Sequence, residues 1–441
     1  MRDEAISKTE QLFSLRVFKL MLVTGLLLLA GGIVRAQENT VTQQKGFQAG
    51  SSYAISDIES INTLNGNVML SVPLGSLPSG RGGSSAGIGL MYNSKLWDVI
   101  EGVSRTGCGM NPDCQGIPYR FIARGEGGWR YNTRYELKNL GESVSTNLNA
   151  GDINFGVCNQ SSVDLYRYVV VTPDGGQHEL FISTPLESFH GNNGGLTYDL
   201  DGTPISSNCW NSTLSRPPAG TVMSYYTLDG TFLRLDVTVL SGNALNWVLR
   251  MPNGGRVEVT SGVSGQKIYD RNNNYVLSEQ ILNYNGTGHA ATKLSDQLGR
   301  ETVIEIGAGP DEDWIYSRGF NNELLTTKVK WKKLYVNRTY YAIPGGVSSI
   351  KSFFKEQRVV ESITLPSQTS GLQYRFAYNA NDTNSSSLST GWGELSSVTL
   401  PSGAVSAYSY KQDNSAQNVL AYDIVHNSPT QKTLTYQDEN D

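Results

Sequence analysis

Short runs of alternating apolar and polar residues, each ending in a glycine-containing turn, recur along most of this chain. Turns of the form Pro-Asp/Asn-Gly-Gly stand at 173–176 and 252–255, Pro-Ser-Gly stands at 401–403, and Asp-Gly without the proline stands at 229–230. Proline presets the φ angle at one position of such a turn, and Asp-Gly or Asn-Gly provides the residue that takes a positive φ. A second strand-like run follows each turn, as in Arg-Val-Glu-Val at 256–259. The pattern therefore predicts a β-hairpin that is repeated several times.

Further turns extend this rhythm along the chain. Residues 270–274 and 296–300 are rich in Asp, Asn and Gly, and Asn65-Gly66 predicts a two-residue hairpin loop nearer the N-terminus. The turns are spaced by about 20 to 30 residues, and a unit of this size cannot bury its apolar face alone, so neighbouring hairpins must stack. We therefore expect an all-β fold of stacked antiparallel β-hairpins, which form an elongated or curled sheet with minimal helix outside the N-terminal segment.

Two stretches of the second half refine this expectation. Residues 372–378 and 405–410 place aromatic side chains at alternate positions, so we expect paired strands with the aromatics on one face. Residues 348–360 mix Phe353 and Phe354 with lysine, glutamate and arginine, and this composition leaves helix and strand equally open.

The first 36 residues have the form of a secretory signal peptide. Arg16 and Lys19 precede an apolar run at 20–30, and Val34 and Ala36 offer the small residues of a cleavage site. The run is shorter than the roughly 20 residues that a bilayer span needs, and an uncleaved N-terminal anchor is the alternative. No other segment has the hydropathy of a span, so we expect a secreted or cell-envelope protein.

Composition divides the remainder into three segments. Residues 37–100 form an N-terminal β segment, residues 101–220 a loop-rich β region that carries all the cysteines, and residues 221–441 the hairpin repeats. The Pro-Pro pair at 217–218 marks the boundary between the last two.

The bulk composition agrees with extended structure and excludes one class of partner. Only 17% of the 441 residues are charged, whereas 47 are glycine and 23 are tyrosine. This mixture is typical of β-strands with many tight turns and unfavourable for helix. The net charge is −5 and no basic run is present, so we expect no binding to nucleic acid.

Cysteine usage fits an oxidising compartment. All four cysteines follow the signal segment, and they allow three pairings. One pairing closes a short loop between the first two and a longer loop between the last two. A zinc site is the weaker rival, because the four histidines are scattered along the chain. The disulfide candidates are Cys108, Cys114, Cys158 and Cys209.

Several stretches carry a family resemblance. Residues 46–54, 57–67 and 72–74, followed by Leu-Met-Tyr-Asn-Ser-Lys-Leu-Trp at 90–97, resemble the start of secreted bacterial RHS/YD-repeat proteins. The turns at 172–176, 296–300 and 400–403 look like the degenerate repeat edges before that family's main array. The resemblance covers most of the mature chain and implies stacked hairpins in a long curling β-sheet, in some members a shell around a toxic C-terminal domain.

The chain also departs from this family. Its repeat core is Tyr-x-Tyr-Asp, but Tyr269-Asp270 matches only in part, and Lys411 stands where the aspartate should follow Tyr408-Ser-Tyr410. The family's C-terminal motif, rich in Asp-Pro-x-Gly, is absent, and no toxin-like tail follows. We therefore expect the N-terminal part of a longer protein or a truncated paralogue, whose open sheet edge self-associates.

Three local patterns are candidates for chemistry, and each has a simpler explanation. Residues 83–87 match Gly-x-Ser-x-Gly, but a nucleophile elbow needs a strand before it and a helix after it, and this match lies in a Gly/Ser loop. Residues 270–274 open like a calcium loop, but Tyr275 and Ile281 stand where the loop requires glycine and glutamate. The acids at 311–313 could serve a glycosidase, but they read as a solvated loop.

Seven tryptophans could stack on sugars. At about one per 60 residues they are better explained as core residues or cross-strand pairs. They are Trp97, Trp129, Trp210, Trp247, Trp314, Trp331 and Trp392.

The sequence thus predicts no catalytic residue, metal site or cofactor. The first hypothesis is an exported RHS-like scaffold or surface interaction protein without intrinsic catalysis. Its partners would be other RHS segments, a downstream toxin-like domain or cell-surface glycans. The alternatives are a secreted carbohydrate-binding or carbohydrate-active β protein, and a truncated front end with no independent activity.

Overall fold

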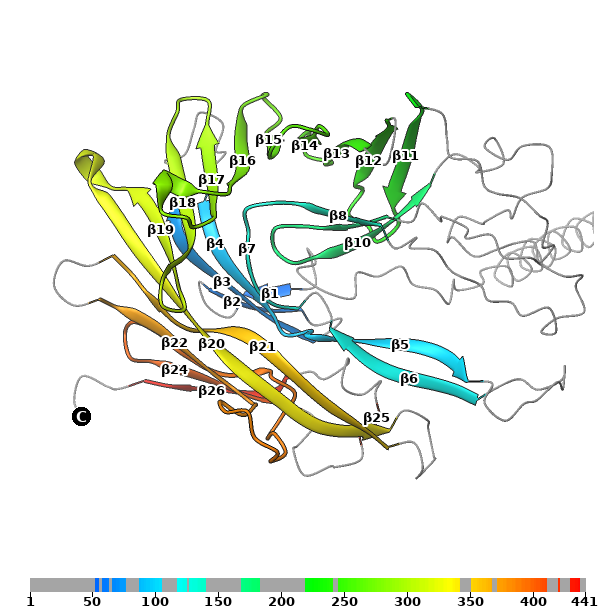
Figure 1. Ribbon diagram of the computed structural model, residues 1–441, viewed down its shortest axis with the longest axis vertical. Helices are drawn as coiled ribbons and strands as arrows, with labels where there is room; N and C mark the ends of the chain where they lie inside the picture. The colour runs from blue at the N-terminus through cyan, green and yellow to red at the C-terminus, as the bar shows by residue number, and fades with distance from the viewer. Residues whose placement is uncertain are drawn as a thin grey trace, which may run out of the picture. The chain divides into compact units, whose positions relative to one another are not determined.

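Antiparallel strands joined by hairpins make up nearly all of the structure (Figure 1). The computed structural model describes residues 52–54, 58–62, 66–76, 87–104, 117–124, 127–139, 168–182, 219–240, 245–341, 350–366, 371–410, 419–420 and 429–436. All of these lie in one unit, residues 43–441. Among the described ladders only that between β20 and β25 (Val419–Leu420) is parallel. The predicted all-β class is confirmed.

The N-terminal part forms a sheet of its own, in the order β1-β2-β3-β4-β7. A separate two-stranded ribbon, β5 with β6, follows β4 in the chain. The bounds are β1 (Ser52–Ala54), β2 (Glu59–Asn62), β3 (Asn67–Ser76), β4 (Gly87–Asn93), β5 (Trp97–Ser104), β6 (Ile117–Arg124) and β7 (Gly128–Tyr131).

A single long sheet takes up the rest of the described chain, and its 18 strands follow one another almost in sequence order. Two 3₁₀ turns, Tyr284–Gly286 and Phe320–Asn322, interrupt its connections. The strands are β8 (Glu136–Asn139), β9 (Tyr168–Val171), β10 (Gln177–Ile182), β11 (Val222–Thr227), β12 (Arg234–Val239), β13 (Leu245–Arg250), β14 (Arg256–Val259), β15 (Gln266–Tyr269), β16 (Tyr275–Ile281), β17 (Ala291–Asp296), β18 (Glu301–Gly309), β19 (Glu312–Arg318), β20 (Leu324–Tyr341), β21 (Ile350–Thr364), β22 (Gln373–Tyr378), β23 (Leu395–Thr399), β24 (Val405–Tyr410) and β26 (Pro429–Thr435).

This sheet is open. It begins at β8, which pairs with β9, and ends at β26, which pairs with β24. No described ladder joins β8 to β26, so the two outer edges stay separate.

One turn geometry closes most of the predicted hairpins. Between β9 and β10, the Gly175 N–H donates to the Thr172 carbonyl (2.8 Å) and the Thr172 N–H donates to the Gly176 carbonyl (2.9 Å). Gly175 has φ +81°, a backbone conformation that is unfavourable for residues with a β-carbon. This is the three-residue hairpin loop in which a left-handed residue forms a bulge. The same pair of bonds closes the turns at 251–255, 270–274, 296–300 and 400–404.

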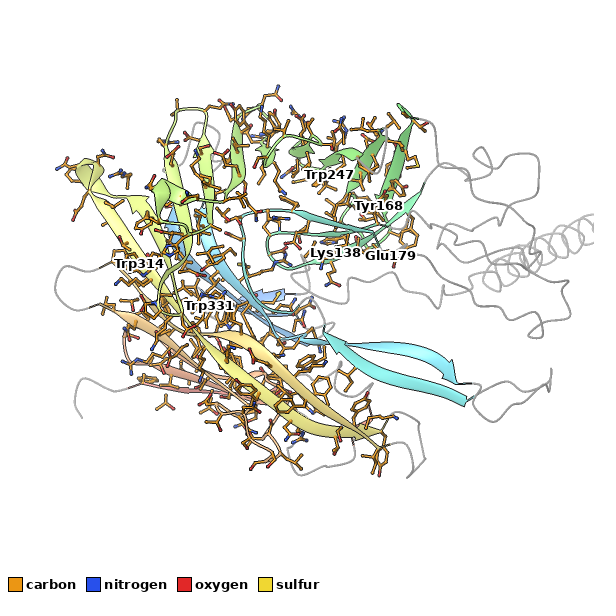
Figure 2. All side chains as sticks on the ribbon, in the orientation of Figure 1. Lys138, Tyr168, Glu179, Trp247, Trp314 and Trp331 are labelled. Atoms are coloured by element: carbon orange, nitrogen blue, oxygen red, sulfur yellow. The ribbon has the colours of Figure 1, made fainter. Side chains whose placement is uncertain are left out.

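The long sheet buries its inner face in two separate cores. The first lies over β9–β15 and contains Tyr168, Tyr225 and Leu249, all at most 2% exposed. The second includes inner-face residues of β17–β24 together with the N-terminal sheet, for instance Leu70 and Ile304. Trp247 and Tyr168 mark the first group of strands in Figure 2, and Trp314 and Trp331 the second.

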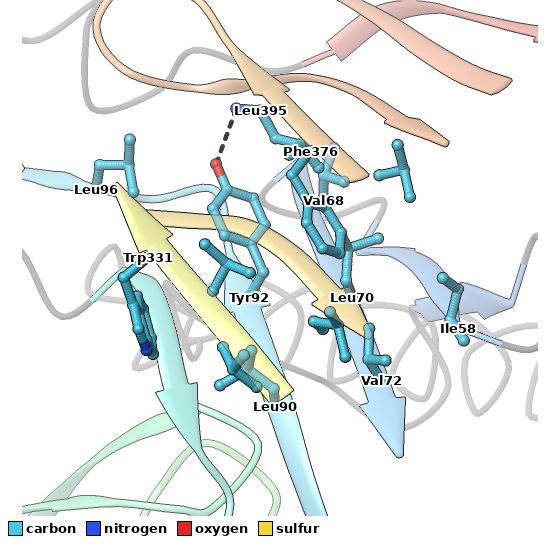
Figure 3. Close-up of a cluster of buried hydrophobic side chains, with 14 of the residues drawn as sticks. Ile58, Val68, Leu70, Val72, Leu90, Tyr92, Leu96, Trp331, Phe376 and Leu395 are labelled. Atoms are coloured by element: carbon cyan, nitrogen blue, oxygen red, sulfur yellow. Dashed lines mark hydrogen bonds between the residues drawn. The ribbon is translucent and has the colours of Figure 1, made fainter. Parts of the chain in front are cut away.

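The N-terminal sheet therefore supplies the apolar cover for the later hairpins. Its strands β3 and β4 place Val68, Leu70 and Leu90 at zero exposure (Figure 3). At Gly75 a β-carbon would lie 3.1 Å from the Cβ of Ser317 on β19. A larger residue there would require Ser317 to shift by a few tenths of an ångström.

Two local expectations need correction, and one is resolved. The loop between β2 and β3 holds the four residues 63–66 rather than two, because the ladder ends at the pair Asn62–Asn67. Strands β22 and β24 do not pair with each other, since both pair with β23, although their aromatics share one face as predicted. Of the stretch 348–360, the described residues 350–360 are strand, because β21 pairs with β20 along nearly its whole length.

Candidate functional site

A buried carboxylate lies where the N-terminal sheet meets the long sheet. Asp313 on β19 is 1% exposed and accepts hydrogen bonds from the Tyr131 hydroxyl (2.9 Å) and the Trp331 indole N–H (2.8 Å). The Gly307 N–H donates to its other oxygen at 3.0 Å. The expectation of a solvated acidic loop is therefore wrong for Asp313, although Asp311 beside it is exposed.

The bonds around Asp313 define what this carboxylate can do. Both oxygens already accept from groups of the fold, and Arg358 lies 3.5 Å away as a further positive neighbour. Burial first, and then the Asp313 charge, hold the pKa of Tyr131 well above its usual value. Asp313 therefore fastens β7 to β19 and β20, and it has no open lone pair for a substrate.

Other polar side chains fasten the same interface. The Leu395 N–H donates to the Tyr92 hydroxyl at 3.0 Å, the dashed contact in Figure 3. The Trp129 indole donates to the Tyr378 hydroxyl at 2.7 Å, and Tyr378 donates in turn to the Val360 carbonyl at 2.6 Å. Burial raises the pKa of Tyr92 and of Tyr378 far above the usual value, so both hydroxyls stay neutral.

An ion pair ties the last described strand to the N-terminal sheet. Lys432 on β26 lies 2.6 Å from Glu59 on β2, with side-chain exposures of 18% and 4%. Ser406 on β24 also contacts the same Glu59 oxygen at 3.4 Å. The N-terminal sheet thus contacts the long sheet from β18 to β26.

A cavity of about 530 Å³ lies between the β7–β8 connection and the inner ends of the hairpins β13–β17. Its apolar wall comes from Met251, Ile268, Val276 and Leu294, and it includes residues of both cores. The turns at 252–255 and 270–274 supply its polar rim. The volume falls within the range of small-molecule sites.

Tyr135 is one of the polar residues that line this cavity. Its hydroxyl contacts the Met251 sulfur at 3.8 Å. The Tyr135 backbone N–H donates to the Gln266 side-chain oxygen at 2.8 Å, and the Gln266 side-chain N–H donates to the Tyr135 carbonyl at 2.7 Å. Burial, with a smaller contribution from the charge of Asp174, raises the pKa of Tyr135 to about 12. Tyr135 is therefore a neutral hydroxyl, suited to hydrogen bonding rather than to proton abstraction at neutral pH.

The turn that resembled a calcium loop uses its carboxylate internally. Asp270 accepts from the backbone N–H groups of Asn272 (2.8 Å) and Asn274 (2.9 Å). The Asn274 side-chain amide donates to its second oxygen at 2.8 Å. Asn273 has a positive φ of 65°, which asparagine tolerates. The asparagines therefore form a turn, which is the simpler explanation of this pattern.

Two histidines have carboxylate partners that the sequence did not reveal. His178 on β10 lies 2.6 Å from Asp229 in the β11–β12 turn, and both side chains are at most 5% exposed. His289 lies 2.8 Å from Glu305, which also accepts from the Tyr316 hydroxyl at 2.8 Å. Among the described residues, no serine or cysteine hydrogen-bonds to either pair as a nucleophile would. Thr231, at 3.5 Å from His178, bonds mainly to Asp229 and Thr227.

The tryptophans are mostly core residues. Trp97, Trp247, Trp331 and Trp392 are all less than 9% exposed, so none of these four can stack on a sugar in this fold. Trp314 is partly exposed and has Lys328 over its ring at 4.6 Å. The interpretation as core and cross-strand residues is confirmed for the buried four.

Some candidates lie outside the described residues. These are Trp210, the four cysteines and all but the last residue of the 83–87 match. Within the described ranges, no three His, Cys, Asp or Glu side chains gather as metal ligands would, and no helix has the length and apolar character needed to cross a membrane.

Comparison with known proteins gives no further guide. No protein-family model matches the chain, and none of the curated proteins is significantly similar to it. Its function must therefore be inferred from its residues and their geometry.

Proposed function

We propose that this chain is an exported, non-catalytic β-hairpin scaffold that presents an extended sheet surface to a partner. The observation that carries the proposal is the use of its buried polar groups. Asp313, Glu59 and Tyr92 all bond across the junction between the two sheets. Buried polar groups whose hydrogen bonds are satisfied by the fold stabilise one arrangement of the two sheets, and these three leave no reactive site at the interface.

The strand order supports the same proposal. From β8 to β24 each strand pairs with the next in sequence, so each added hairpin extends the surface without rearranging the preceding ones. Within the described ladders, β8 and β26 each pair on one side only. Leu434 on β26 is 54% exposed, and Tyr436, just after this strand, is 70% exposed. An open edge of this kind can accept a strand from a partner or a second copy.

Export follows from the sequence of residues 1–36. Positive charge before an 11-residue apolar run and small residues at 34 and 36 are what a signal peptidase substrate requires. The similarity to RHS/YD-repeat proteins is consistent with this location.

Cell fractionation tests the proposal. The full chain and a variant lacking residues 2–36 are expressed with a C-terminal tag in a bacterial host, and culture medium, periplasm and cytoplasm are probed. We expect the full chain outside the cytoplasm with a new N-terminus near residue 37, and the shortened variant in the cytoplasm. A full chain that stays in the cytoplasm with its N-terminus intact would contradict export.

Carbohydrate binding is the second candidate, in a changed form. Trp392 cannot stack on a sugar, because its side chain is buried at 2% exposure. The exposed tyrosines and arginines on the outer face of β11–β16 favour another location.

A further inference from the structure

Three arginines stand side by side on adjacent strands of the long sheet. The ladders pair Arg234 on β12 with Arg250 on β13, and Arg250 with Arg256 on β14. Tyr226 on β11 extends the row at one end, and Tyr269 on β15, followed by Tyr275 on β16, extends it at the other. With strands about 4.8 Å apart, these six positions span about 24 Å.

The row lies on the face opposite the core. Neighbours of the row along the chain, such as Tyr225, Leu235 and Leu249, are fully buried, and side chains alternate between faces of a strand. The side chains of Arg234 and Arg250 are 45% and 53% exposed.

Such an arrangement is unfavourable for the fold by itself. Like charges directly opposite each other in a ladder are destabilising. Two carboxylates in the next row reduce the repulsion: Asp236 bridges Arg234 (2.8 Å) and Arg250 (3.0 Å), and Glu258 accepts from Arg256 (2.6 Å). Lys267 stands opposite Glu258 in that next row, so the two rows together carry four positive and two negative charges.

The carboxylates also fix how the guanidinium groups are oriented. In all three arginines the bond to the carboxylate is made by Nε. This leaves the terminal Nη groups for other partners. Arg234 and Arg256 each make one further bond through an Nη atom, to Ser224 at 3.4 Å and Asn273 at 2.6 Å. Arg250, in the centre, makes no other bond to the described residues.

Aromatic rings flank the arginines on both sides. The Arg256 guanidinium lies 3.8 Å from the centroid of the Tyr269 ring, and Arg234 lies 5.7 Å from that of Tyr226. Tyr226 is 39% exposed. The row therefore combines planar cationic donors with amphipathic rings along one line.

We propose that this Arg/Tyr row, defined by Tyr226, Arg234, Arg250, Arg256, Tyr269 and Tyr275, binds an acidic polysaccharide that runs across the strands. The planar fork of arginine matches a carboxylate or sulfate group with two parallel hydrogen bonds. Tyrosine rings cover the apolar faces of sugars while their hydroxyls stay in water. The inference deepens the proposed function by naming what the surface binds, and it rests on that function for a chain located where such polymers occur.

The charge pattern favours a polysaccharide over a nucleic acid. Nucleic-acid binding gains its affinity from many phosphate contacts, and single strands need successive aromatic platforms for their bases. Here three arginines separate the two aromatic ends, and the whole chain carries a net charge of −5. A polymer with sparser acidic groups meets less repulsion from the rest of the surface.

Affinity gel electrophoresis of the purified chain tests this proposal. Native gels contain polygalacturonate, dextran sulfate or neutral dextran, and migration is compared with a gel without polymer. We expect retardation by at least one acidic polymer and none by dextran. Arg250→Gln should weaken the apparent affinity by about tenfold, because one charge-assisted contact is lost. Arg250→Lys, which keeps the charge and loses the fork, should weaken it less than the glutamine variant does.

The matched control is Arg375→Gln on β22, which removes the same charge from an exposed position outside the row. Thermal unfolding checks that each variant is folded. Equal weakening by Arg375→Gln, or no retardation of the wild type, would overturn the proposal. Displacement by oligo-dT at the same concentration as by polygalacturonate would replace the polysaccharide with a nucleic acid. Because the purified chain is used, this result is independent of the export experiment.

Discussion

The two halves of the long sheet bury their inner faces in different ways. Strands β9–β15 pack on one another's side chains, with help from β8 and from Tyr135 on the β7–β8 connection. Strands β17–β24 instead pack against a second sheet, the N-terminal one, which supplies Val68, Leu70 and Leu90. The same hairpin unit therefore serves in both halves, and what differs is the source of the covering surface.

This difference has a consequence for the polar groups. In the covered half, buried acids and tyrosines such as Asp313 and Tyr92 bond across the interface between the sheets. In the other half, the polar residues with the densest bonding are local, such as His178 with Asp229, or lie on the outer face, such as Arg250 with Asp236. The covered half is fixed by long-range contacts, and the other half has exposed charges on its outer face.

The largest effect should come from removing a tryptophan from each core. Trp392→Ala in the covered half and Trp247→Ala in the other should each lower the free energy of unfolding by about 3–5 kcal/mol, measured by urea unfolding. Trp392 accepts a hydrogen bond from the Trp97 indole at 2.7 Å through its backbone and packs on Phe353 at 5.4 Å. Only Trp392→Ala should also speed hydrogen exchange in β3 and β4. Equal acceleration in both variants would show that the two halves unfold as one unit.

The next effect concerns the carboxylate between the sheets. Asp313→Ala leaves the donors of Tyr131, Trp331 and Gly307 without an acceptor, and we expect a loss of about 3 kcal/mol in urea unfolding. The control is Asp311→Asn, which removes the charge of an exposed neighbour but keeps a residue type that tolerates its φ of 56°, and it should change stability by less than about 0.5 kcal/mol. A loss confined to β17–β26, with β3 and β4 unchanged in hydrogen exchange, would contradict the role of Asp313 as a fastener.

A smaller, pH-dependent effect belongs to the other half. Burial would raise the pKa of Asp229, but the bonds from His178 and Thr231 outweigh it and lower that pKa. The stabilisation is therefore full above the unfolded value of about 3.9 and is lost as the pH falls through the lower folded value. Asp229→Asn should cost roughly 1–2 kcal/mol at pH 7. The gap to the wild type should close in acid, and a gap that stays constant down to pH 2 would contradict the ion pair.

Local features of this fold could be predicted from the sequence, because the residues that cause them are adjacent. The turns at 173–176, 252–255 and 401–403 form as expected, since proline, asparagine or aspartate and glycine set the backbone angles where they stand. The strands on either side follow from their alternation. Residues 350–360 were ambiguous because their pairing with β20, and not their composition, makes them a strand.

The contacts between the sheets could not be predicted in the same way. Tyr131 and Asp313 are 182 positions apart, and no local pattern connects them. One signal was present: Asp313 lies in phase with Ile315 and Ser317, the inward positions of β19. The alternation could not be recognised in the sequence, because the acidic residues 311 and 312 directly precede Asp313. The Arg/Tyr row was invisible for another reason, because it exists only once the register of six strands is known.

The smallest effect compares one turn from each half. Gly254 and Gly403 occupy the same position in the same turn, with φ +84° and +87°. An alanine at either site has to adopt a left-handed backbone conformation, which costs about 1 kcal/mol. At Gly254 it would also lie 3.2 Å from the Cβ of Arg271, whereas at Gly403 nothing lies within 4 Å. Gly254→Ala should therefore lower the midpoint of urea unfolding slightly more than Gly403→Ala, with Asn273→Gly as a near-neutral control. A larger loss at Gly403 would mean that the covered half depends on its turns more than on the sheet that covers it.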